Sequence, residues 1–168
     1  MICLEVGPGT GGRYRFSPVA PVSCDPIVFL DTEPPRGRAK YVGEWVVGDA
    51  EMMPFRSTAF DMVYASHVIE HLENPELFLY NMYRICRPGC SAVVRTPNFL
   101  SRNARGDPDH RHVFTVFKLW RAARLAGFKV YISGCEAGTL LPRQLARLLT
   151  ILFALLSDTI EVVLRREA

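Results

Sequence analysis

"LEVGPGTGG" (residues 4–12) stands close to the start of the chain and joins a short apolar run to a cluster of glycines. The apolar run predicts a buried strand over 1–6, and the glycines predict a tight turn directly after it. A turn without side chains lets the backbone approach a ligand closely. The stretch therefore predicts a ligand-binding loop at the carboxyl end of a first strand.

The short apolar runs that follow this loop predict an α/β fold. Further strands are expected over 25–31, 45–50, 60–65, 90–97, 128–133 and 159–166, and helices over 74–89, 115–127 and 140–157. The strands lack clear alternation, which is typical of strands buried on both faces of a parallel sheet. Strands that alternate with helices predict helices packed on a central sheet. We expect residues 1–168 to form a single domain, because a chain of this length is enough for one core.

The composition is that of an ordinary globular protein, with 49% hydrophobic and 22% charged residues. A net charge of +3 is too small to indicate nucleic-acid binding. The five cysteines are odd in number and scattered, so we expect reduced thiols and a cytoplasmic protein. No secretory leader is recognisable, and the longest apolar run, 148–156, is about half of the ~18–20 residues that a membrane span needs.

Two ligand classes fit the glycine loop. Residues 7–12 read G-x-G-x-x-G, and Asp31 follows about 20 residues later, as in dinucleotide-binding folds. Residues 5–11 also read E-x-G-x-G-x-G, the first motif of S-adenosylmethionine-dependent methyltransferases. The loop by itself leaves both classes open.

The rest of the chain favours the second class. It resembles, in order and spacing, the class I methyltransferases often labelled type 11, through "EVGPGTG" (5–11), "FLDTEP" (29–34), "VGDAEMMPFRSTAFDMVYASHVIEHL" (47–72) and "DHRHVFTVFKLWRAARLAGF" (109–128). The resemblance implies a Rossmann-like three-layer sandwich with a seven-stranded, mostly parallel sheet and an antiparallel last strand. It also implies that the helices which usually precede the first strand are lacking.

The resemblance implies an S-adenosylmethionine site at the carboxyl ends of the strands. Glu5 is expected near the methionine ammonium group, Asp31 at the ribose hydroxyls and Asp49 at the adenine amine. The full set of expected cofactor residues is Glu5, Gly7, Gly9, Gly11, Asp31, Asp49, Ala50 and Ser66.

An oxygen or nitrogen acceptor must lose a proton during methyl transfer, and histidine titrates near neutrality. His67 is the first candidate because it follows the fourth strand, beside the expected methyl position. His112 is the second, on a loop after the fifth strand. We interpret Glu70 and His71 as residues that orient the loop.

The sequence predicts no metal centre. Asp109, His110 and His112 offer suitable donor atoms, but no fourth ligand is indicated.

The expected reaction is methyl transfer to a small or lipid-like acceptor. No Asn/Asp-Pro-Pro-aromatic motif is present, which favours an oxygen or carbon acceptor over an amino group. The alternatives are an inactive scaffold protein with the same fold and an NAD-dependent oxidoreductase.

The apolar segment 140–157 has three interpretations. It packs on its own sheet, forms a homodimer surface, or acts as an amphipathic lid with peripheral membrane contact.

Overall fold

A computed structural model of the chain describes residues 1–9, 24–35, 43–133 and 157–167. The strands are β1 (Cys3–Val6), β2 (Ile27–Asp31), β3 (Glu44–Val47), β4 (Phe60–Ser66), β5 (Cys86–Pro97), β6 (Lys129–Ser133) and β7 (Thr159–Arg165). The helices are the 3-10 turn η1 (Ala50–Met52), α1 (Pro75–Ile85), α2 (Arg102–Gly106) and α3 (Val116–Leu125). Each predicted strand is present, with ends that differ by a few residues.

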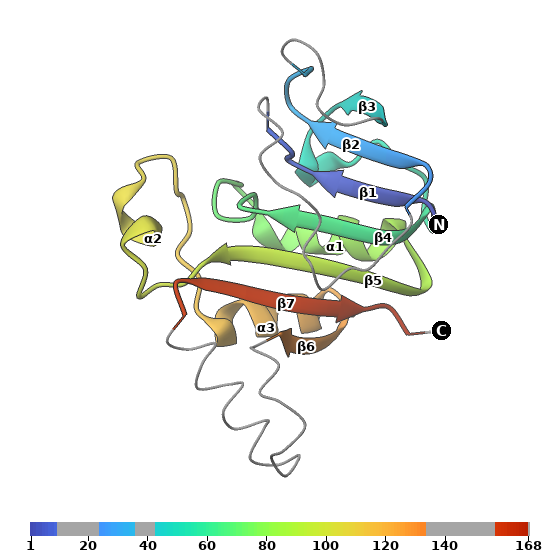
Figure 1. Ribbon diagram of the computed structural model, residues 1–168. Coiled ribbons are helices and arrows are strands. Elements are labelled where there is room, and N and C mark those ends of the chain that lie inside the picture. The colour runs from blue at the N-terminus through green and yellow to red at the C-terminus, as the bar shows by residue number, and fades with distance from the viewer. Residues whose placement is uncertain (10–23, 36–42, 134–156, 168) are drawn as a thin grey trace, which may run out of the picture.

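The seven described strands form one sheet in the order β3-β2-β1-β4-β5-β7-β6 (Figure 1). Strands β1 to β5 pair in parallel, and β7 runs antiparallel between β5 and β6. The expected class, a mostly parallel Rossmann-like sheet with an antiparallel last strand, is confirmed. In such a sheet the carboxyl ends of the parallel strands share one edge, where open α/β sheets bind ligands.

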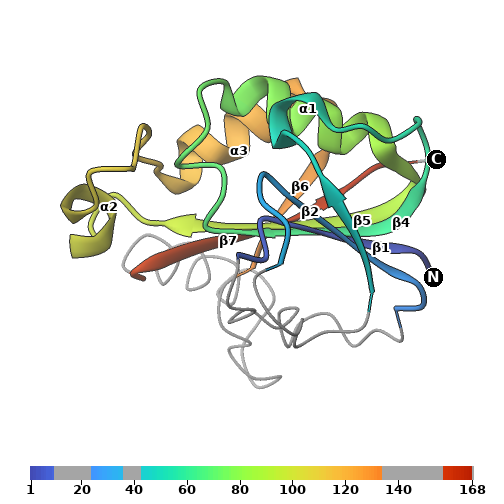
Figure 2. The same ribbon diagram turned by 90° about the horizontal axis from the view of Figure 1, so that it is seen from above.

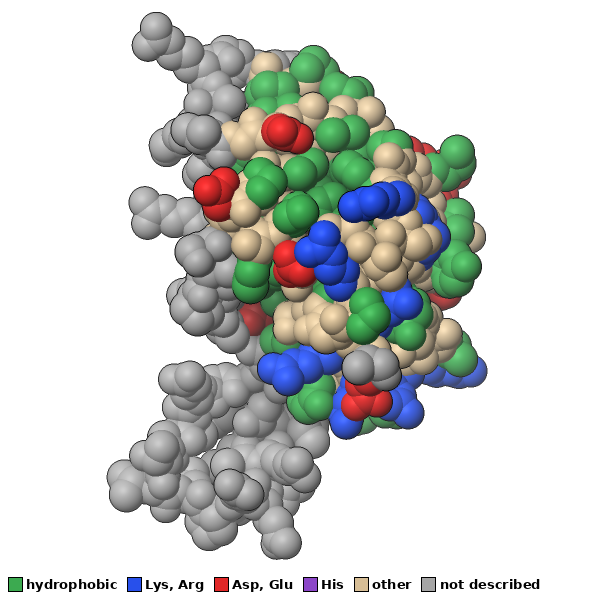
Figure 3. Space-filling view, turned by 90° about the vertical axis from the view of Figure 1, so that its right-hand side faces the viewer, with side chains coloured by type: hydrophobic (Ala, Val, Ile, Leu, Met, Phe, Trp, Pro, Cys, Tyr) green, Lys and Arg blue, Asp and Glu red, His purple; other side chains and the backbone are tan. Residues whose placement is uncertain are grey.

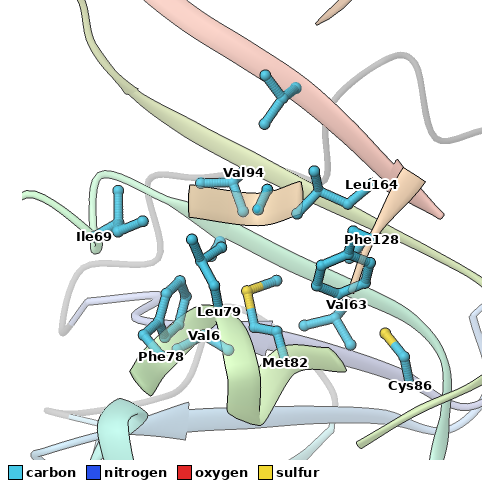
Figure 4. Packing of buried hydrophobic residues seen from close by; sticks show 14 of the residues in the cluster. Val6, Val63, Ile69, Phe78, Leu79, Met82, Cys86, Val94, Phe128 and Leu164 are labelled. Atoms are coloured by element: carbon cyan, nitrogen blue, oxygen red, sulfur yellow. The ribbon is translucent and has the colours of Figure 1, made fainter. Parts of the chain in front are cut away.

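Helices α1 and α3 cover the same face of the sheet (Figure 2). Phe78, Leu79 and Met82 of α1 are fully buried and pack with side chains of β1, β4 and β5 (Figure 4). Burying a side chain of this kind contributes about 1.5–3 kcal/mol. The apolar face of α1 therefore fixes the helix on the sheet, and with it the loop that connects β4 to α1.

Helix α1 begins as predicted but ends four residues early. Asn74 accepts a hydrogen bond from the Leu77 amide at 2.9 Å, which caps the first turn. The expected helix over 74–89 stops at Ile85, and Cys86 is already extended and paired in β5. Pro88 is the physical reason, because a proline disfavours helical backbone in the residue before it.

The start of β7 is tied to the end of β5. Thr159 pairs with Pro97 in the sheet. The Asn98 amide side chain donates to the Ser157 carbonyl at 2.8 Å, and the Asn98 backbone N–H donates to the Asp158 carbonyl at 2.9 Å. The last strand therefore enters the sheet at the edge where the parallel strands end.

The prediction that all cysteines are reduced is wrong for two of them. Cys3 of β1 and Cys24 form a disulfide with a Cα–Cα distance of 5.6 Å. Their separation of 21 residues gave no sequence signal, because pairing depends on a distance that only the fold sets. Cys86 and Cys90 are free and buried.

The predicted helix over 140–157, its homodimer surface and its membrane contact lie outside the described residues, apart from Ser157. Across the described ranges, no helix is long and apolar enough to cross a membrane.

Candidate functional site

The described residues that directly follow β1 to β5 lie at one edge of the sheet. Backbone hydrogen bonds hold them there, from the Gly7 amide to the Leu30 carbonyl at 2.8 Å and from the Gly48 amide to the Asp31 carbonyl at 2.9 Å. On the opposite edge, Lys, Arg, Asp, Glu and hydrophobic side chains are mixed, and no histidine is visible among the described residues (Figure 3). All four histidines of the chain lie within 67–71 and 110–112, on the loop side. The edge at the carboxyl ends of the parallel strands therefore carries all the histidines of the chain.

The turn after β1 needs glycine at two positions for different reasons. Gly7 has φ +66°, and a Cβ built on it would lie 2.4 Å from Cγ2 of Val68. Gly9 has φ +69°, but a Cβ there would meet no described atom within 4 Å. Gly7 is therefore required by packing, whereas Gly9 borders open space that a ligand can use. Gly11 lies outside the described residues.

A cavity of about 270 Å³ lies beside this turn. Its wall includes Gly7, Asp31, Asp49 and Ala50, which are four of the predicted cofactor residues, together with His67. Asp31 is held in place because its Oδ2 accepts from the Gly9 amide at 2.9 Å. The structure thus brings the ends of β1, β2, β3 and β4 onto one surface, as the sequence predicted.

Asp49 also has a structural task. Its Oδ1 accepts from the Glu51 amide at 2.7 Å and caps η1. A carboxylate has two oxygens, so capping occupies one and leaves the other for a ligand donor.

Glu5 is placed differently from the other predicted carboxylates. Its side chain is only 3% exposed and does not line either of the cavities described here. Burial raises the pKa of the Glu5 carboxyl to about 7, because removal from water disfavours its charged form. A nearby cation would favour the charged form and lower that pKa again.

A second cavity of about 800 Å³ adjoins the first. The two share Gly7, His67 and His71, so one wall faces both spaces. The remainder of the second wall comes from Ser66, Pro97 and the loop that includes Gly106–Pro108 and His110.

Ser66 lines the second cavity with an unsatisfied hydroxyl. The residue is 4% exposed, and its Oγ has no hydrogen-bond partner among the described residues. A buried hydroxyl without a partner costs about 1–3 kcal/mol. A ligand with a polar group at this wall would remove that cost.

His67 adopts a backbone conformation that is rare for a residue with a side chain. Its φ is +56°, and its amide donates to the Arg95 carbonyl at 2.9 Å. Its Nδ1 lies 3.2 Å from Oε1 of Glu70. Such strain costs about 1–3 kcal/mol and is concentrated at functional sites. In this backbone conformation, His67 lies on the wall that both cavities share.

Glu70 joins three parts of this edge. Its Oε2 accepts from the Thr96 hydroxyl at 3.0 Å, and its carbonyl accepts from the amides of Arg111 and His112. The interpretation of Glu70 as a residue that orients the loop agrees with these contacts. The sequence gave no sign that ligand atoms of Glu70 and His110 would lie within 4.8 Å of each other, because 40 positions of chain separate them.

Of the two predicted bases, His67 lines both cavities and His112 lines neither. His112 is half-buried and does not line either cavity, and its Nε2 lies 3.4 Å from the Glu73 carbonyl. His110, two residues earlier, lies on the second cavity instead. Its ring centroid is 4.7 Å from that of His71. A loop position cannot be assigned from sequence to within two residues when no regular element fixes its direction.

A parallel sheet with a glycine turn and carboxylates around one cavity defines a Rossmann-like ligand-binding protein. A family model described as "Methyltransferase domain" matches residues 4–94, which is more than half of the chain. The chain therefore belongs to the methyltransferase domain family. Its fold is that of the class I enzymes, which use S-adenosylmethionine, so the expected family and cofactor are confirmed.

Two curated relatives support this assignment. The mitochondrial 2-methoxy-6-polyprenyl-1,4-benzoquinol methylase of Caenorhabditis elegans is 33% identical over 103 residues, which cover 55% of this chain and 36% of the relative. Norajmaline N-methyltransferase of Rauvolfia serpentina is 30% identical over 99 residues, covering 54% of this chain and 34% of that enzyme. The chain thus matches only about a third of the length of these relatives.

Among solved structures, the chain resembles the methyltransferase bound to the Trm112 methyltransferase activator of Haloferax volcanii. The TM-score is 0.71 at 17% identity, and the match covers 99% of this chain and 82% of the other. At this identity the likeness shows the fold alone.

Proposed function

We propose that this chain transfers the methyl group of S-adenosylmethionine to an oxygen or carbon atom of a small or lipid-like acceptor. The observation that carries the proposal is the pair of adjoining cavities, which share the wall formed by Gly7, His67 and His71. One cavity would hold the cofactor and the other the acceptor. The shared wall is then the place where the two reacting atoms approach each other.

The residues of the first cavity fit the cofactor. Asp31 offers carboxylate oxygens to hydroxyl donors, and Gly7 brings the backbone close to the space. Gly9, on the adjoining second cavity, borders open space. The unsatisfied Ser66 hydroxyl belongs to the wall of the second cavity, next to the shared residue His67 in the sequence. S-Adenosylmethionine, when bound, supplies a methyl group on a positively charged sulfur. Glu5 is a buried carboxylate that an ammonium group would bring to its charged form.

The protein contributes alignment, exclusion of water and a proton acceptor. His67 lies on the shared wall and takes the proton from the acceptor, with Glu70 3.2 Å from its Nδ1. An oxygen acceptor loses its proton to His67, the new oxygen–carbon bond forms, and the sulfur–carbon bond breaks. The products are the methylated acceptor and S-adenosylhomocysteine.

The acceptor class rests on the size of the second cavity and on the relatives. A cavity of about 800 Å³ accommodates a ring system or part of a chain. The name of the Caenorhabditis elegans relative includes a polyprenyl benzoquinol, which is a lipid-like ring compound. The name of the Rauvolfia serpentina relative specifies a nitrogen acceptor, so an acceptor screen should include amines.

The cytoplasmic location remains a prediction. The Cys3–Cys24 disulfide is unusual for a strongly reducing compartment. Counting free thiols in protein taken directly from cells, with alkylation at lysis, tests it. Complete reduction of this pair agrees with the cytoplasm, and an intact disulfide contradicts it.

Calorimetry with S-adenosylmethionine, S-adenosylhomocysteine and NAD tests the proposed function. We expect micromolar binding of the first two, at least a tenfold loss in Asp31→Ala, and no change in Glu76→Ala, an exposed carboxylate of α1 outside both cavities. Binding of NAD alone would establish the oxidoreductase alternative. Binding of none of the three would favour the scaffold alternative.

A further inference from the structure

Glu70, His71 and His110 form a cluster that the sequence did not predict. Each offers one ligand atom, and the three atoms lie within 4.8 Å of one another. The first two follow β4, and the third follows α2, so the fold brings them together. We propose that these three side chains bind a divalent transition-metal ion of the zinc type at the wall of the second cavity.

The state of Glu70 supports this site independently. The residue is 1% exposed, and its Oε1 lies 3.2 Å from Nδ1 of His67 without a hydrogen bond of good geometry among the described residues. Burying a carboxylate is costly, and coordinating a cation is a common way to compensate that cost. An ion beside Oε1 would add this compensation to the contact with His67.

Each proposed ligand is oriented by a second group, as is usual around protein-bound metals. Thr96 donates to Oε2 of Glu70 at 3.0 Å. The Nδ1 atoms of His71 and His110 lie 3.1 Å from the Asp109 carbonyl and 3.4 Å from the Ala104 carbonyl. A carbonyl only accepts, so both rings carry their proton on Nδ1. The Nε2 lone pair of each ring is then the one that a metal can use.

The donor set selects the kind of ion. Two imidazoles and one carboxylate are the ligands of catalytic zinc sites, whereas magnesium prefers oxygen ligands. Donors around one tetrahedral zinc ion lie roughly 3.4 Å apart, so ligation requires the three side chains to approach by about 1 Å. Asp107 lies near, with Oδ2 3.7 Å from Nε2 of His110. It is a candidate for the fourth ligand.

The position of the cluster suggests what the ion would do. His71 and His110 line the second cavity, so an open coordination position would face that space. If the proposed function holds, a metal there would bind an acceptor hydroxyl and lower its pKa, which favours oxygen acceptors such as phenols. The metal site itself does not depend on that function.

Titration of metal-free protein with Zn²⁺ tests the site, by calorimetry and by the visible absorption of Co²⁺ as a substitute. We expect one ion per chain. His71→Ala and His110→Ala should each weaken Zn²⁺ binding at least thirtyfold, and Glu70→Gln should do the same if it folds. His112→Ala is the matched control on the same loop and should leave binding within threefold. Circular dichroism confirms that each variant is folded.

The outcomes are distinct from those for the methyltransferase. Absence of Zn²⁺ binding, binding that survives both His71→Ala and His110→Ala, or a preference for Mg²⁺ over Zn²⁺ would each overturn the site. S-Adenosylhomocysteine binding is measured on the same samples. Its retention without Zn²⁺ binding would remove the metal and leave the proposed function standing.

Discussion

The turn after β1 and the loop after β4 face the same pair of cavities, but they present different chemistry to them. In its described part, the turn offers backbone at Gly7 and Gly9, both with positive φ and without a side chain. The loop offers titratable side chains, with His67, Glu70 and His71 in one stretch. The backbone surface of the turn suits the proposed cofactor, which is the same in every reaction. The side chains of the loop after β4 suit proton transfer from the proposed acceptor.

The same contrast appears in how the two regions are held. The turn is fixed by neighbours close in space on β2, through the Gly7 amide and the Asp31 carboxylate. The loop is fixed by Thr96 of β5 and by the loop that carries His110. Changes in the turn should therefore affect folding and cofactor binding together, and changes in the loop should affect turnover first.

The largest effect on stability is expected at Gly7. Gly7→Ala adds backbone strain of about 1–2 kcal/mol and a clash of about 1–3 kcal/mol with Val68. We expect the free energy of unfolding in urea to fall by about 3 kcal/mol. Gly9→Ala carries the strain without the clash and should lose about 1 kcal/mol.

A Val68→Ala background separates the two contributions. There, Gly7→Ala should cost only the strain, about 1–2 kcal/mol. An unchanged cost in that background would show that the contact with Val68 does not explain the requirement for glycine.

Glu5 predicts a pH dependence of stability. The folded protein keeps a proton on Glu5 up to about pH 7, whereas the unfolded chain releases it near the ordinary value of 4.5. The free energy of unfolding should therefore fall as the pH rises from about 4.5 to about 7, by at most about 3 kcal/mol. Above pH 7 this contribution stays constant.

Urea titrations at several pH values check this, with Glu5→Gln as the variant that removes the slope. Glu76→Gln, at an exposed position, should keep it. Saturating S-adenosylhomocysteine should reduce the slope if its ammonium group lies near Glu5. Identical pH profiles for wild type and Glu5→Gln would show that Glu5 is already ionised in the folded protein.

His67 should affect turnover with little effect on binding. Asparagine tolerates positive φ, so His67→Asn keeps the backbone and removes the base. We expect the methyl-transfer rate to fall about a hundredfold, with S-adenosylhomocysteine affinity within threefold of wild type. A larger rate loss in His112→Asn would contradict the placement of the base at His67.

Thr115 gives the smallest effect and serves as a stability control. Its hydroxyl accepts from the Lys118 amide at 3.1 Å and caps α3, away from both cavities. Thr115→Ala should lower the free energy of unfolding by about 1 kcal/mol and leave cofactor and Zn²⁺ affinity unchanged. A change in either affinity would mean that general loss of stability, rather than local chemistry, explains the other variants.

That several predicted cofactor residues would line one cavity could be predicted, because their sequence signals are local. Gly7, Asp31 and Asp49 each follow an apolar run, and parallel strands bring their carboxyl ends to one edge without further information. The helix caps at Asn74 and Thr115 were readable for the same reason.

The grouping of Glu70, His71 and His110 could not be predicted, because it depends on contacts between segments that are distant in the sequence. Glu70 meets Thr96, and His71 meets His110, because the fold brings these distant segments together. The number of residues between two positions does not predict their contact in space when a helix and a strand separate them. The Cys3–Cys24 disulfide escaped prediction for the same reason.

The antiparallel entry of β7 has a consequence for protein engineering. Ser133 pairs with Glu161, and Thr159 pairs with Pro97, so the chain leaves and rejoins the sheet beside the larger cavity. The pairings of β7 with β5 and β6 are therefore the part of this region that a design should leave unchanged when it aims to alter the cavity.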